Sequence, residues 1–498
     1  MSTEQEPLIA PLPTAAPIKR ADGKDVDHDA RLERDTLPET ATVGRTIGTA
    51  SAYILVMSRV IGSGIFAMPG TVLQSAGSPG LALLLWTIGA LIAWCGLVID
   101  LEYGCMFPRS GGIKVYLEHT YPHPRYLVST LIAVHVVLLG FTASNCIVFA
   151  KYTFFAFDAQ ASDFLVKLVA VGLMTAITVV HGCFYRTGVL VQNVLGWLKI
   201  GLVLFMVLTG LFVVVFGIQR DSSSNIQRFP DLWKNSNWSY NAVATTFFKI
   251  FYSYAGLDNI NNILNEVKNP VRTLRWVPPL SLLTACALYI LINVAYLAVV
   301  PLKEIKQSRE LISALFFERV FGSGIGNIVL PLGIALSAAG NVMVVTFSVV
   351  STGHATAERL LTWQARINQE VARVGFLPYG KILASSKPFN APLGGLIVHY
   401  IPSVVVIVLP PSKDVYAFIA EIEAYTGQFF ALAVAIGLVI LRFREPDTPR
   451  PFRAWLSAVY VRIALCVSLI IAPLIPSRQS GGKIKLFDVA YAFVSIST

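Results

Sequence analysis

Charged side chains are scarce in this chain, and their scarcity argues against an ordinary soluble protein. Only 14% of its 498 residues are charged, whereas 55% are hydrophobic, and the mean hydropathy is +0.64. Soluble domains carry about 25% charged residues. The composition therefore predicts a protein that crosses a lipid bilayer many times.

Motifs of the common enzyme classes are missing as well. The sequence has no Walker A motif, no HExxH motif and no nucleophile accompanied by a credible base. We therefore expect no enzymatic activity, no cofactor and no bound metal. If the chain moves a solute, we expect an ion gradient rather than ATP to supply the energy.

Cysteines are few, and none is arranged for a disulfide or a metal. The sequence has no CxxC pair, and all six cysteines lie within or at the edges of apolar runs. Such cysteines are expected to be small core residues. They are Cys95, Cys105, Cys146, Cys183, Cys286 and Cys466.

The start of the chain lacks the apolar core of a signal peptide. Residues 1–45 are polar and contain proline, which predicts a disordered cytoplasmic tail rather than a cleaved leader. Lys19 and Lys24 lie in this tail, where a ubiquitin ligase is a candidate partner that would drive endocytosis.

Long apolar runs make up most of the remaining sequence and predict an all-α membrane protein of about 12 transmembrane helices. We expect a transmembrane domain over 46–476, with ten core helices between about 47 and 441 and an eleventh at 456–476. A loop and a short twelfth span follow in 477–498, and this span is either a truncated helix or an interfacial tail. The runs are 47–74, 81–106, 126–154, 163–183, 189–217, 240–265, 277–300, 325–352, 394–410, 415–441, 456–476 and 486–498.

The net charge of +10 is explained by membrane topology rather than by nucleic acid binding. With a cytoplasmic N-terminus, the inner segments hold 22 Lys and Arg residues and the outer loops hold 11. The positive-inside rule therefore places the N-terminus in the cytosol. A sequon at Asn237 falls in a loop that this topology puts outside, so it is either a glycosylation site or a chance match.

Glycine and small polar residues interrupt two of the apolar runs. The interruptions are Gly62-Ser63-Gly64-Ile65-Phe66 and Tyr252-Ser253-Tyr254-Ala255-Gly256-Leu257-Asp258-Asn259, each in the first span of one five-span half. Unwound backbone is tolerated in lipid only where protein or a water-filled cavity replaces its hydrogen bonds. Because each half has an odd number of spans, the halves are expected to be inverted. The pattern predicts a secondary transporter with its substrate site at the two breaks.

The two breaks offer complementary groups to an amino acid. At Gly62-Ser63-Gly64 the N–H groups at the start of a half-helix favour a carboxylate, although such a triplet is also typical of close helix packing. Carbonyls near Ser253, Ala255 and Gly256 would accept hydrogen bonds from an ammonium. Together these groups suit a zwitterion.

Charges within the apolar runs are expensive unless they are paired or face water. Lys199 either ties the first helix to the fifth or bridges backbone carbonyls for stability alone. Asp258 either takes a proton or caps the second half-helix. Lys249 and Arg59 precede the two breaks and either reach a vestibule or extend to water. We expect His135 to be a satisfied core histidine rather than a proton relay.

These features resemble the amino acid–polyamine–organocation superfamily, and within it the L-type amino acid transporters and their fungal methionine permease group. The match runs over about residues 45–476. Its marks are the segments Arg59-Val60-Ile61-Gly62-Ser63-Gly64-Ile65-Phe66-Ala67-Met68-Pro69, Leu101-Glu102-Tyr103-Gly104, Pro108-Arg109-Ser110-Gly111-Gly112, Val191-Gln192-Asn193 leading to Lys199, Tyr254-Ala255-Gly256-Leu257-Asp258-Asn259 and Glu266-Val267-Lys268-Asn269-Pro270.

The resemblance implies a leucine-transporter-type fold, a 5+5 inverted repeat with broken helices 1 and 6. It implies that Ser63 and Gly64 bind the substrate carboxylate and that carbonyls of Val60, Tyr252 and Ala255 receive the ammonium. It also implies that Tyr252 is an aromatic gate and that Lys199 takes the place of a coupling sodium ion. Proton symport is then implied. The candidate substrate-binding residues are Val60, Ile61, Gly62, Ser63, Gly64, Tyr252, Ser253, Ala255, Gly256 and Asp258.

The sequence departs from the family pattern at two places, and each departure limits which family properties can be expected of this chain. Leu257 replaces the usual tryptophan, which leaves the side-chain pocket and the substrate open. The loop at 152–162 lacks the cysteine that joins exchangers of this family to a heavy chain, so we expect a one-chain permease.

We therefore expect a plasma-membrane importer of a neutral amino acid, methionine first, that works by proton symport with alternating access. A nutrient sensor, an exchanger of broader specificity and a channel are the alternatives.

Overall fold

The fold is taken from a computed structural model of the chain. The residues that the structure describes all belong to one compact unit, Ala41–Thr498. They are 47–108, 110–124, 127–139, 142–159, 162–183, 185–216, 232–262, 264, 267–322, 324–346, 393–409 and 415–475. The N-terminal tail with Lys19 and Lys24, residues 353–392 and the twelfth apolar run fall outside them.

The described chain is helical, with a single isolated bridge between Ile47 and Val267. Helices satisfy their backbone hydrogen bonds internally, as lipid requires. The helices before residue 217 are α2 (Thr49–Val60), α3 (Gly64–Ala76), α4 (Pro79–Met106), α5 (Ile113–Thr120), α6 (Leu127–Leu139), α7 (Ala143–Ala156), α8 (Asp163–Cys183) and α9 (Tyr185–Phe216). Those after residue 231 are α10 (Tyr240–Tyr254), η2 (Leu257–Asn262), α11 (Pro270–Val299), α12 (Leu302–Ser308), η4 (Arg309–Leu311), α13 (Ile312–Phe321), η5 (Ile325–Val329), α14 (Leu330–Thr346), α17 (Leu393–Val408), α18 (Val415–Arg444), α19 (Leu456–Ile471) and η8 (Ala472–Leu474).

The first predicted break lies between α2 and α3, whose axes are bent by 44°. Close packing explains why glycine stands on both sides of Ser63. A Cβ added at Gly62 would lie 3.0 Å from Nδ2 of Asn341 on α14, and one at Gly64 would lie 2.9 Å from Oγ of Ser253 on α10. The break therefore brings α3 directly against the other interrupted helix.

The second predicted break follows Tyr254, where α10 ends and the backbone of Ala255 is extended. Gly256 has a φ of +100°, which favours glycine, and a Cβ there would lie 2.6 Å from Cγ of Arg59 on α2. The chain then continues as the 3-10 helix η2. Both broken helices are thus confirmed, and they contact one another on both sides of their breaks.

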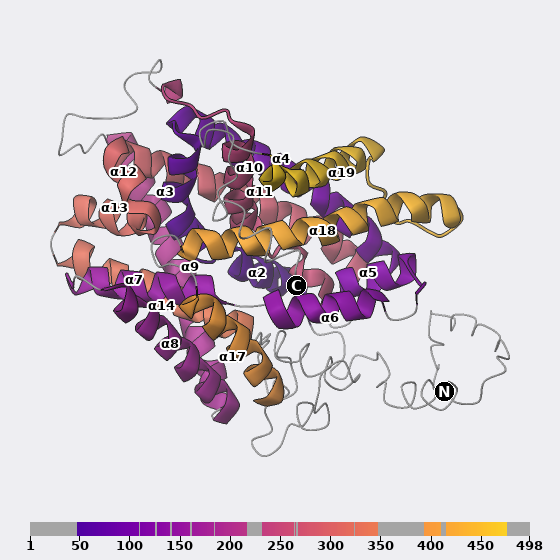
Figure 1. The fold of residues 1–498 in the computed structure, drawn as a ribbon, viewed down its shortest axis with the longest axis horizontal. Helices are drawn as coiled ribbons and strands as arrows, with labels where there is room; N and C mark the ends of the chain where they lie inside the picture. The colour runs from indigo at the N-terminus through magenta and orange to yellow at the C-terminus, as the bar shows by residue number, and fades with distance from the viewer. Residues whose placement is uncertain are drawn as a thin grey trace, which may run out of the picture. The chain divides into compact units, whose positions relative to one another are not determined.

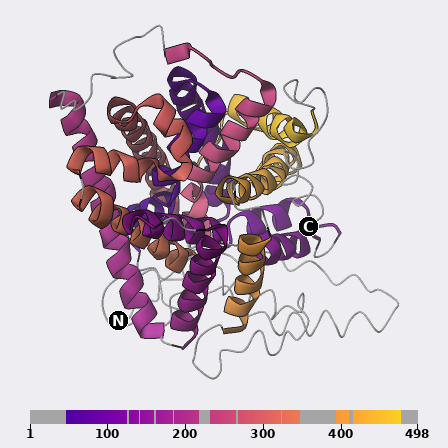
Figure 2. The same ribbon diagram turned by 60° about the vertical axis from the view of Figure 1, so that its left-hand side comes forward.

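Helices at corresponding places in the two halves pack together, as an inverted repeat would have them. The pair α3 and α10 is one example, and α7 packs against α14 and α8 against α17. α18, the tenth helix of the core, and α19 lie side by side, as the orange and yellow ribbons of Figures 1 and 2 show.

Two expectations from hydropathy were incomplete. The run 126–154 forms two helices, α6 and α7, because an apolar average does not register a short link between helices. The segment 301–324, which falls between two of the apolar runs and is therefore expected to be a loop, contains α12, η4 and α13. Its apolar residues Ile305, Phe316 and Phe317 are buried, so the segment folds back as part of the protein core.

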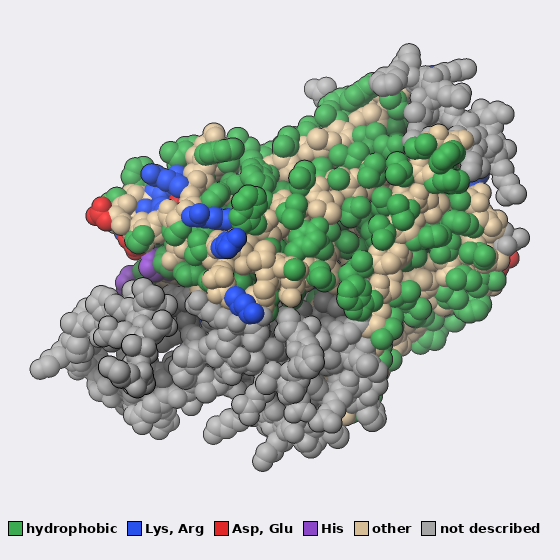
Figure 3. Space-filling model, turned by 180° about the vertical axis from the view of Figure 1, so that it is seen from behind, with side chains coloured by type: hydrophobic (Ala, Val, Ile, Leu, Met, Phe, Trp, Pro, Cys, Tyr) green, Lys and Arg blue, Asp and Glu red, His purple; other side chains and the backbone are tan. Residues whose placement is uncertain are grey.

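Apolar side chains on the outside of the described residues fit a lipid environment. Trp197, Leu283 and Phe164 are each more than two-thirds exposed. In Figure 3 green apolar side chains cover much of the described surface, while basic and acidic ones gather near one end. In the described residues five helices are long and apolar enough to cross a membrane, or up to six with the bent pair α2–α3 counted as one.

Candidate functional site

A small cavity of 60 Å³ lies where the two broken helices meet. Its walls include seven of the predicted substrate-binding residues, together with Thr142, Ser144 and Asn145 at the start of α7 and Asn341 on α14. The seven are Val60, Gly62, Ser63, Gly64, Tyr252, Ser253 and Ala255. The cavity is far smaller than the roughly 300–1,000 Å³ of typical ligand pockets, so the site is contracted in this conformation.

The start of α3 presents backbone donors to this cavity. Ser63 is the N-cap of α3, and its side chain makes no capping hydrogen bond. The first N–H groups of an α-helix have no partner within the helix, and the helix dipole makes this end attractive to an anion. The geometry therefore suits a carboxylate at Ser63 and Gly64.

Hydroxyl groups close over the helix start. The Tyr252 hydroxyl lies 2.7 Å from Oγ of Ser144 on α7 and 3.4 Å from Oγ of Ser63. The Tyr416 hydroxyl of α18 lies 3.3 Å from the same Ser63 oxygen. Tyr252 thus joins three helices across the cavity, a position that suits a gate.

The carbonyl groups expected to receive an ammonium are already partly engaged. The carbonyl of Val60 accepts from the Gly62 N–H at 2.9 Å and from the Tyr289 hydroxyl at 3.4 Å. Tyr289, on α11, also donates to the carbonyl of Ser253 at 2.6 Å. The carbonyl of Tyr252 accepts from the Ala255 N–H at 3.4 Å. Tyr289 bridges the two breaks, a role that the sequence did not indicate.

Lys199 lies on α9 and is almost completely buried. Its ammonium donates to the carbonyl of Ser58 on α2 at 2.7 Å and to Oδ1 of Asn341 on α14 at 3.3 Å. Among the described residues no carboxylate forms an ion pair with it. The ammonium therefore joins the end of α2 to α9 and α14, next to the small cavity that Asn341 lines.

A larger cavity of 410 Å³ adjoins the small one. The two share Arg59, Tyr252, Ala255, Val345 and Glu423 as lining residues. Among the predicted residues, Gly256 and Asp258 line the larger cavity and not the smaller, as does Leu257. Ile61 lines neither; it is buried and its N–H closes the last turn of α2.

The α3 side of the small cavity is sealed by packed side chains. The Tyr152 hydroxyl on α7 donates to the carbonyls of Phe66 and Glu310, and Ser313 of α13 also donates to Phe66. Lys249, expected to reach a vestibule or water, instead donates to Oγ of Ser75 at 2.7 Å and lies 3.8 Å from a carboxylate oxygen of Glu421. These contacts hold α3, α10, α13 and α18 together.

Two further expectations have mixed outcomes. His135 is not a fully satisfied histidine: its Nδ1 is buried and has no hydrogen-bond partner among the described residues. Its ring lies 4.7 Å from that of Phe430, and it lines the larger cavity. The Asn237 side chain accepts hydrogen bonds from the backbone and hydroxyl of Ser239. Its glycosylation stays a prediction.

Three charged residues of the larger cavity were missed by the sequence reading. They are Asp100 on α4, Glu423 on α18 and Arg462 on α19. Each lies in an apolar run, so the rule that flagged Lys199 and Asp258 would have found them had it been applied to every span.

The profile of the amino acid permease family matches residues 47–496 of the chain. The low-affinity methionine permease of Saccharomyces cerevisiae is 32% identical over 458 residues, which cover 91% of this chain and 81% of the relative. The high-affinity methionine permease of the same yeast is 33% identical over 87% of this chain and 73% of its own length. The human b(0,+)-type amino acid transporter 1 is 26% identical over 90% of this chain and 86% of its own length.

Solved structures extend the likeness at the level of the fold. The crystal structure of a mutant Eremococcus coleocola manganese transporter aligns with a TM-score of 0.52 and covers 92% of this chain and 96% of that protein. At 14% identity this likeness concerns the fold alone.

Proposed function

Because this chain belongs to the amino acid permease family, we propose that it is a secondary active transporter that imports a neutral amino acid, methionine, across the plasma membrane. The observation that carries the proposal is the meeting of two broken helices in one cavity. Donors at the start of α3 and carbonyls at the end of α10 are the groups that a zwitterion needs there.

The substrate carboxylate would bind the N–H groups of Ser63 and Gly64. The ammonium would bind carbonyls of Val60, Tyr252 and Ala255, and for this the Tyr289 hydroxyl must release Val60. Gly62 and Ser253 would shape the walls of this site, whereas Ile61 lies buried behind it and Gly256 and Asp258 line the adjoining larger cavity. Tyr252 would move to admit the substrate, because its hydroxyl now bridges Ser63 and Ser144.

Alternating access would open the two sides of this site in turn. In the present conformation the α3 side is held by packed side chains, whereas the larger cavity adjoins the break on the α2 and η2 side. With the N-terminus in the cytosol, this conformation would correspond to the inward-facing half of the cycle.

Proton symport is the mode of energy coupling that we propose, with Lys199 in the place of a sodium ion. Its ammonium already occupies a position between the end of α2 and α14. A lysine ammonium in that position would leave no room for sodium. The chain is proposed to act alone, without a heavy chain.

The test is uptake of labelled methionine by cells that lack their own permeases and express this chain alone. We expect concentrative uptake, competed by unlabelled methionine more strongly than by other neutral amino acids. Methionine is chosen because the two yeast relatives are methionine permeases. Equal competition by a broad panel would remove the methionine assignment, and the absence of net uptake by correctly localised protein would favour a sensor.

Exchange is the second mode to be separated from net import. It follows from the alternative that the sequence left open, an exchanger of broader specificity. Cells preloaded with unlabelled methionine would take up label much faster than empty cells if exchange were obligatory. Net accumulation in empty cells, driven by a proton gradient, is the result expected for a symporter.

A further inference from the structure

The larger cavity carries charges of both signs from five different elements. Arg59 comes from α2, Asp100 from α4, Asp258 from η2, Glu423 from α18 and Arg462 from α19. We call it the charged cavity. Its 410 Å³ fall within the roughly 300–1,000 Å³ of pockets that bind small molecules.

Among the described residues, these five side chains form no ion pair or hydrogen bond with another side chain. Nε of Arg462 is buried without a hydrogen-bond partner there, and the guanidinium lies over the Phe251 ring, 5.7 Å from its centroid. Pairing does occur nearby, since Glu102 is bound by Arg442 and Arg450 in the same bundle. Unpaired charges at membrane depth are expensive and usually face water or a ligand, so the charged cavity is built for polar contents.

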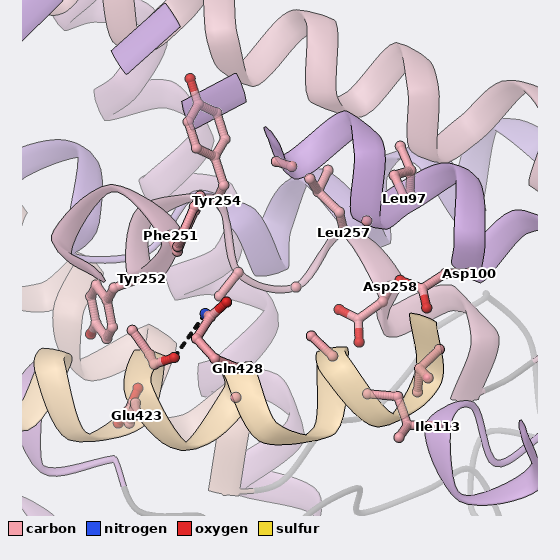
Figure 4. Close-up of a pocket in the computed structure, with 18 of the residues that line it drawn as sticks. Leu97, Asp100, Ile113, Phe251, Tyr252, Tyr254, Leu257, Asp258, Glu423 and Gln428 are labelled. Carbon is pink, nitrogen blue, oxygen red and sulfur yellow. Dashed lines mark hydrogen bonds between the residues drawn. The ribbon is translucent and has the colours of Figure 1, made fainter. Parts of the chain in front are cut away.

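The positions of these charges indicate which kind of ligand the charged cavity can bind. Asp100 and Asp258 lie side by side at one end of the cavity, and Glu423 lies toward Tyr252 at the other (Figure 4). A plain anion would meet three carboxylates, and a polyamine would meet two guanidinium groups. A zwitterion can place its ammonium at the acidic pair and its carboxylate toward a guanidinium. Leu97, Phe251 and Leu257 add apolar wall for a side chain.

The charged cavity continues directly from the small cavity. Arg59 and Glu423 line both, and so do Tyr252 and Ala255 of the second break. A molecule that leaves the small cavity on the α2 and η2 side therefore enters the charged cavity next.

We propose that the charged cavity is a second binding site for the transported zwitterionic amino acid, occupied on the α2 and η2 side of the pathway. Asp100 and Asp258 hold the ammonium, and Arg59 and Arg462 offer guanidinium groups to the carboxylate. The inference rests on the proposed transport function, because the cargo is taken to be the same amino acid.

The test compares transport of labelled methionine from the two sides of the membrane, in right-side-out and inside-out vesicles containing the full chain. The variant is Asp100→Asn combined with Asp258→Asn, which removes both carboxylates with little change in size. Losing charged hydrogen bonds of about 1.5–3 kcal/mol should raise the half-saturating concentration about tenfold or more. We expect this rise only for entry from the charged-cavity side, with less than about a twofold change from the other side.

The matched control is Asp447→Asn, an exposed carboxylate in the link between α18 and α19. It should leave both half-saturating concentrations unchanged. If the double variant is not found in the vesicles, Asp258→Asn alone is measured, and at least a threefold rise on the charged-cavity side is expected. Equal values on both sides for a folded variant would overturn the second site. A wild-type chain that transports no amino acid in either direction would instead overturn the proposed function.

Discussion

Gly64 has two structural roles, one in the substrate site and one in the packing of α3 against α10. Its N–H belongs to the helix start that faces the small cavity, and its α-carbon lies against Ser253 of α10. We predict that Gly64→Val abolishes methionine uptake, because a Cβ alone would lie 2.9 Å from the Ser253 Oγ and 3.0 Å from its Cα. Uptake is measured against the amount of protein at the cell surface.

The control for this substitution is Gly172→Val on α8, where an added Cβ meets nothing within 4 Å. It should retain most uptake. The sequence by itself predicts that the β-branched side chain obstructs the N–H donors and leaves surface expression largely intact. The structure adds helix separation as a cause, so some loss of surface protein is also expected. Wild-type uptake by Gly64→Val would remove Gly64 from the site.

Lys199 is the residue whose surroundings allow the sharpest substitution series. Lys199→Ala should abolish concentrative uptake, since the carbonyl of Ser58 and Oδ1 of Asn341 lose their common donor. Lys199→Arg should rescue poorly, because a planar guanidinium does not match a place filled by a compact ammonium. Lys303→Ala on α12, with an exposed side chain, is the control. Full activity of Lys199→Ala would show that the ammonium is dispensable.

At the scale of helices, the sequence predicted what depends on local residues. Both breaks were found because glycine and small polar residues within an apolar run are a local signal. The link between α6 and α7 carries a similar signal in Gly140, Thr142, Ser144 and Asn145, but hydropathy averaged over the whole run conceals it. The folding of α12 and α13 onto α3 depends on contacts such as that of Ser313 with Phe66, which lie 247 positions apart. Such pairs cannot be read from one sequence.

The residues of the candidate site also fall into two groups, those that the local sequence predicts and those that only the fold brings together. Seven of its predicted residues lie together because they flank the breaks, whereas Ser144, Asn341, Tyr289 and Tyr416 enter from other helices. Nothing local marks these four as partners of a site. The charged cavity was only partly predicted, through Asp258 and Arg59, since its remaining charges face those two only after folding.

The end of α4 is fastened to α18 by a buried ionic cluster. Glu102, with no exposed surface, accepts hydrogen bonds from Nε of Arg442 at 3.1 Å and from the backbone N–H of Ala454 at 2.7 Å, and Nε of Arg450 lies 3.3 Å away. We predict that Glu102→Gln destabilises the protein by about 3–5 kcal/mol, because two guanidinium groups lose their counter-charge. Thermal unfolding of the purified protein measures this.

An exposed carboxylate on a neighbouring helix serves as the comparison. Glu118 on α5 pairs with Lys114 at 3.8 Å, and both side chains are substantially exposed. Glu118→Gln should change stability by no more than about 0.5 kcal/mol. If both variants unfold at the wild-type temperature, the cluster at Glu102 does not hold α4 to α18.

At the scale of the whole molecule, the first prediction concerns its amount at the cell surface. Lys19 and Lys24 lie in the polar N-terminal sequence, which we propose to be cytosolic and accessible to a ubiquitin ligase. The double Lys→Arg variant should stay at the surface when methionine is added in excess, while the wild type is internalised. Internalisation of both at the same rate would dismiss these lysines as targets.

Energy coupling is a property of the whole molecule, because the coupling ion must bind and leave in step with the substrate. If Lys199 permanently fills the place of sodium, only protons remain as the coupling ion. Uptake measured at a fixed membrane potential should therefore rise as the outside becomes more acidic and should not change when sodium is replaced by choline. The Lys303→Ala protein should behave as the wild type, whereas Lys199→Ala should show no accumulation at any pH. Accumulation that follows sodium and ignores pH would contradict both proton symport and the role of Lys199, while leaving the zwitterion site at the two breaks intact.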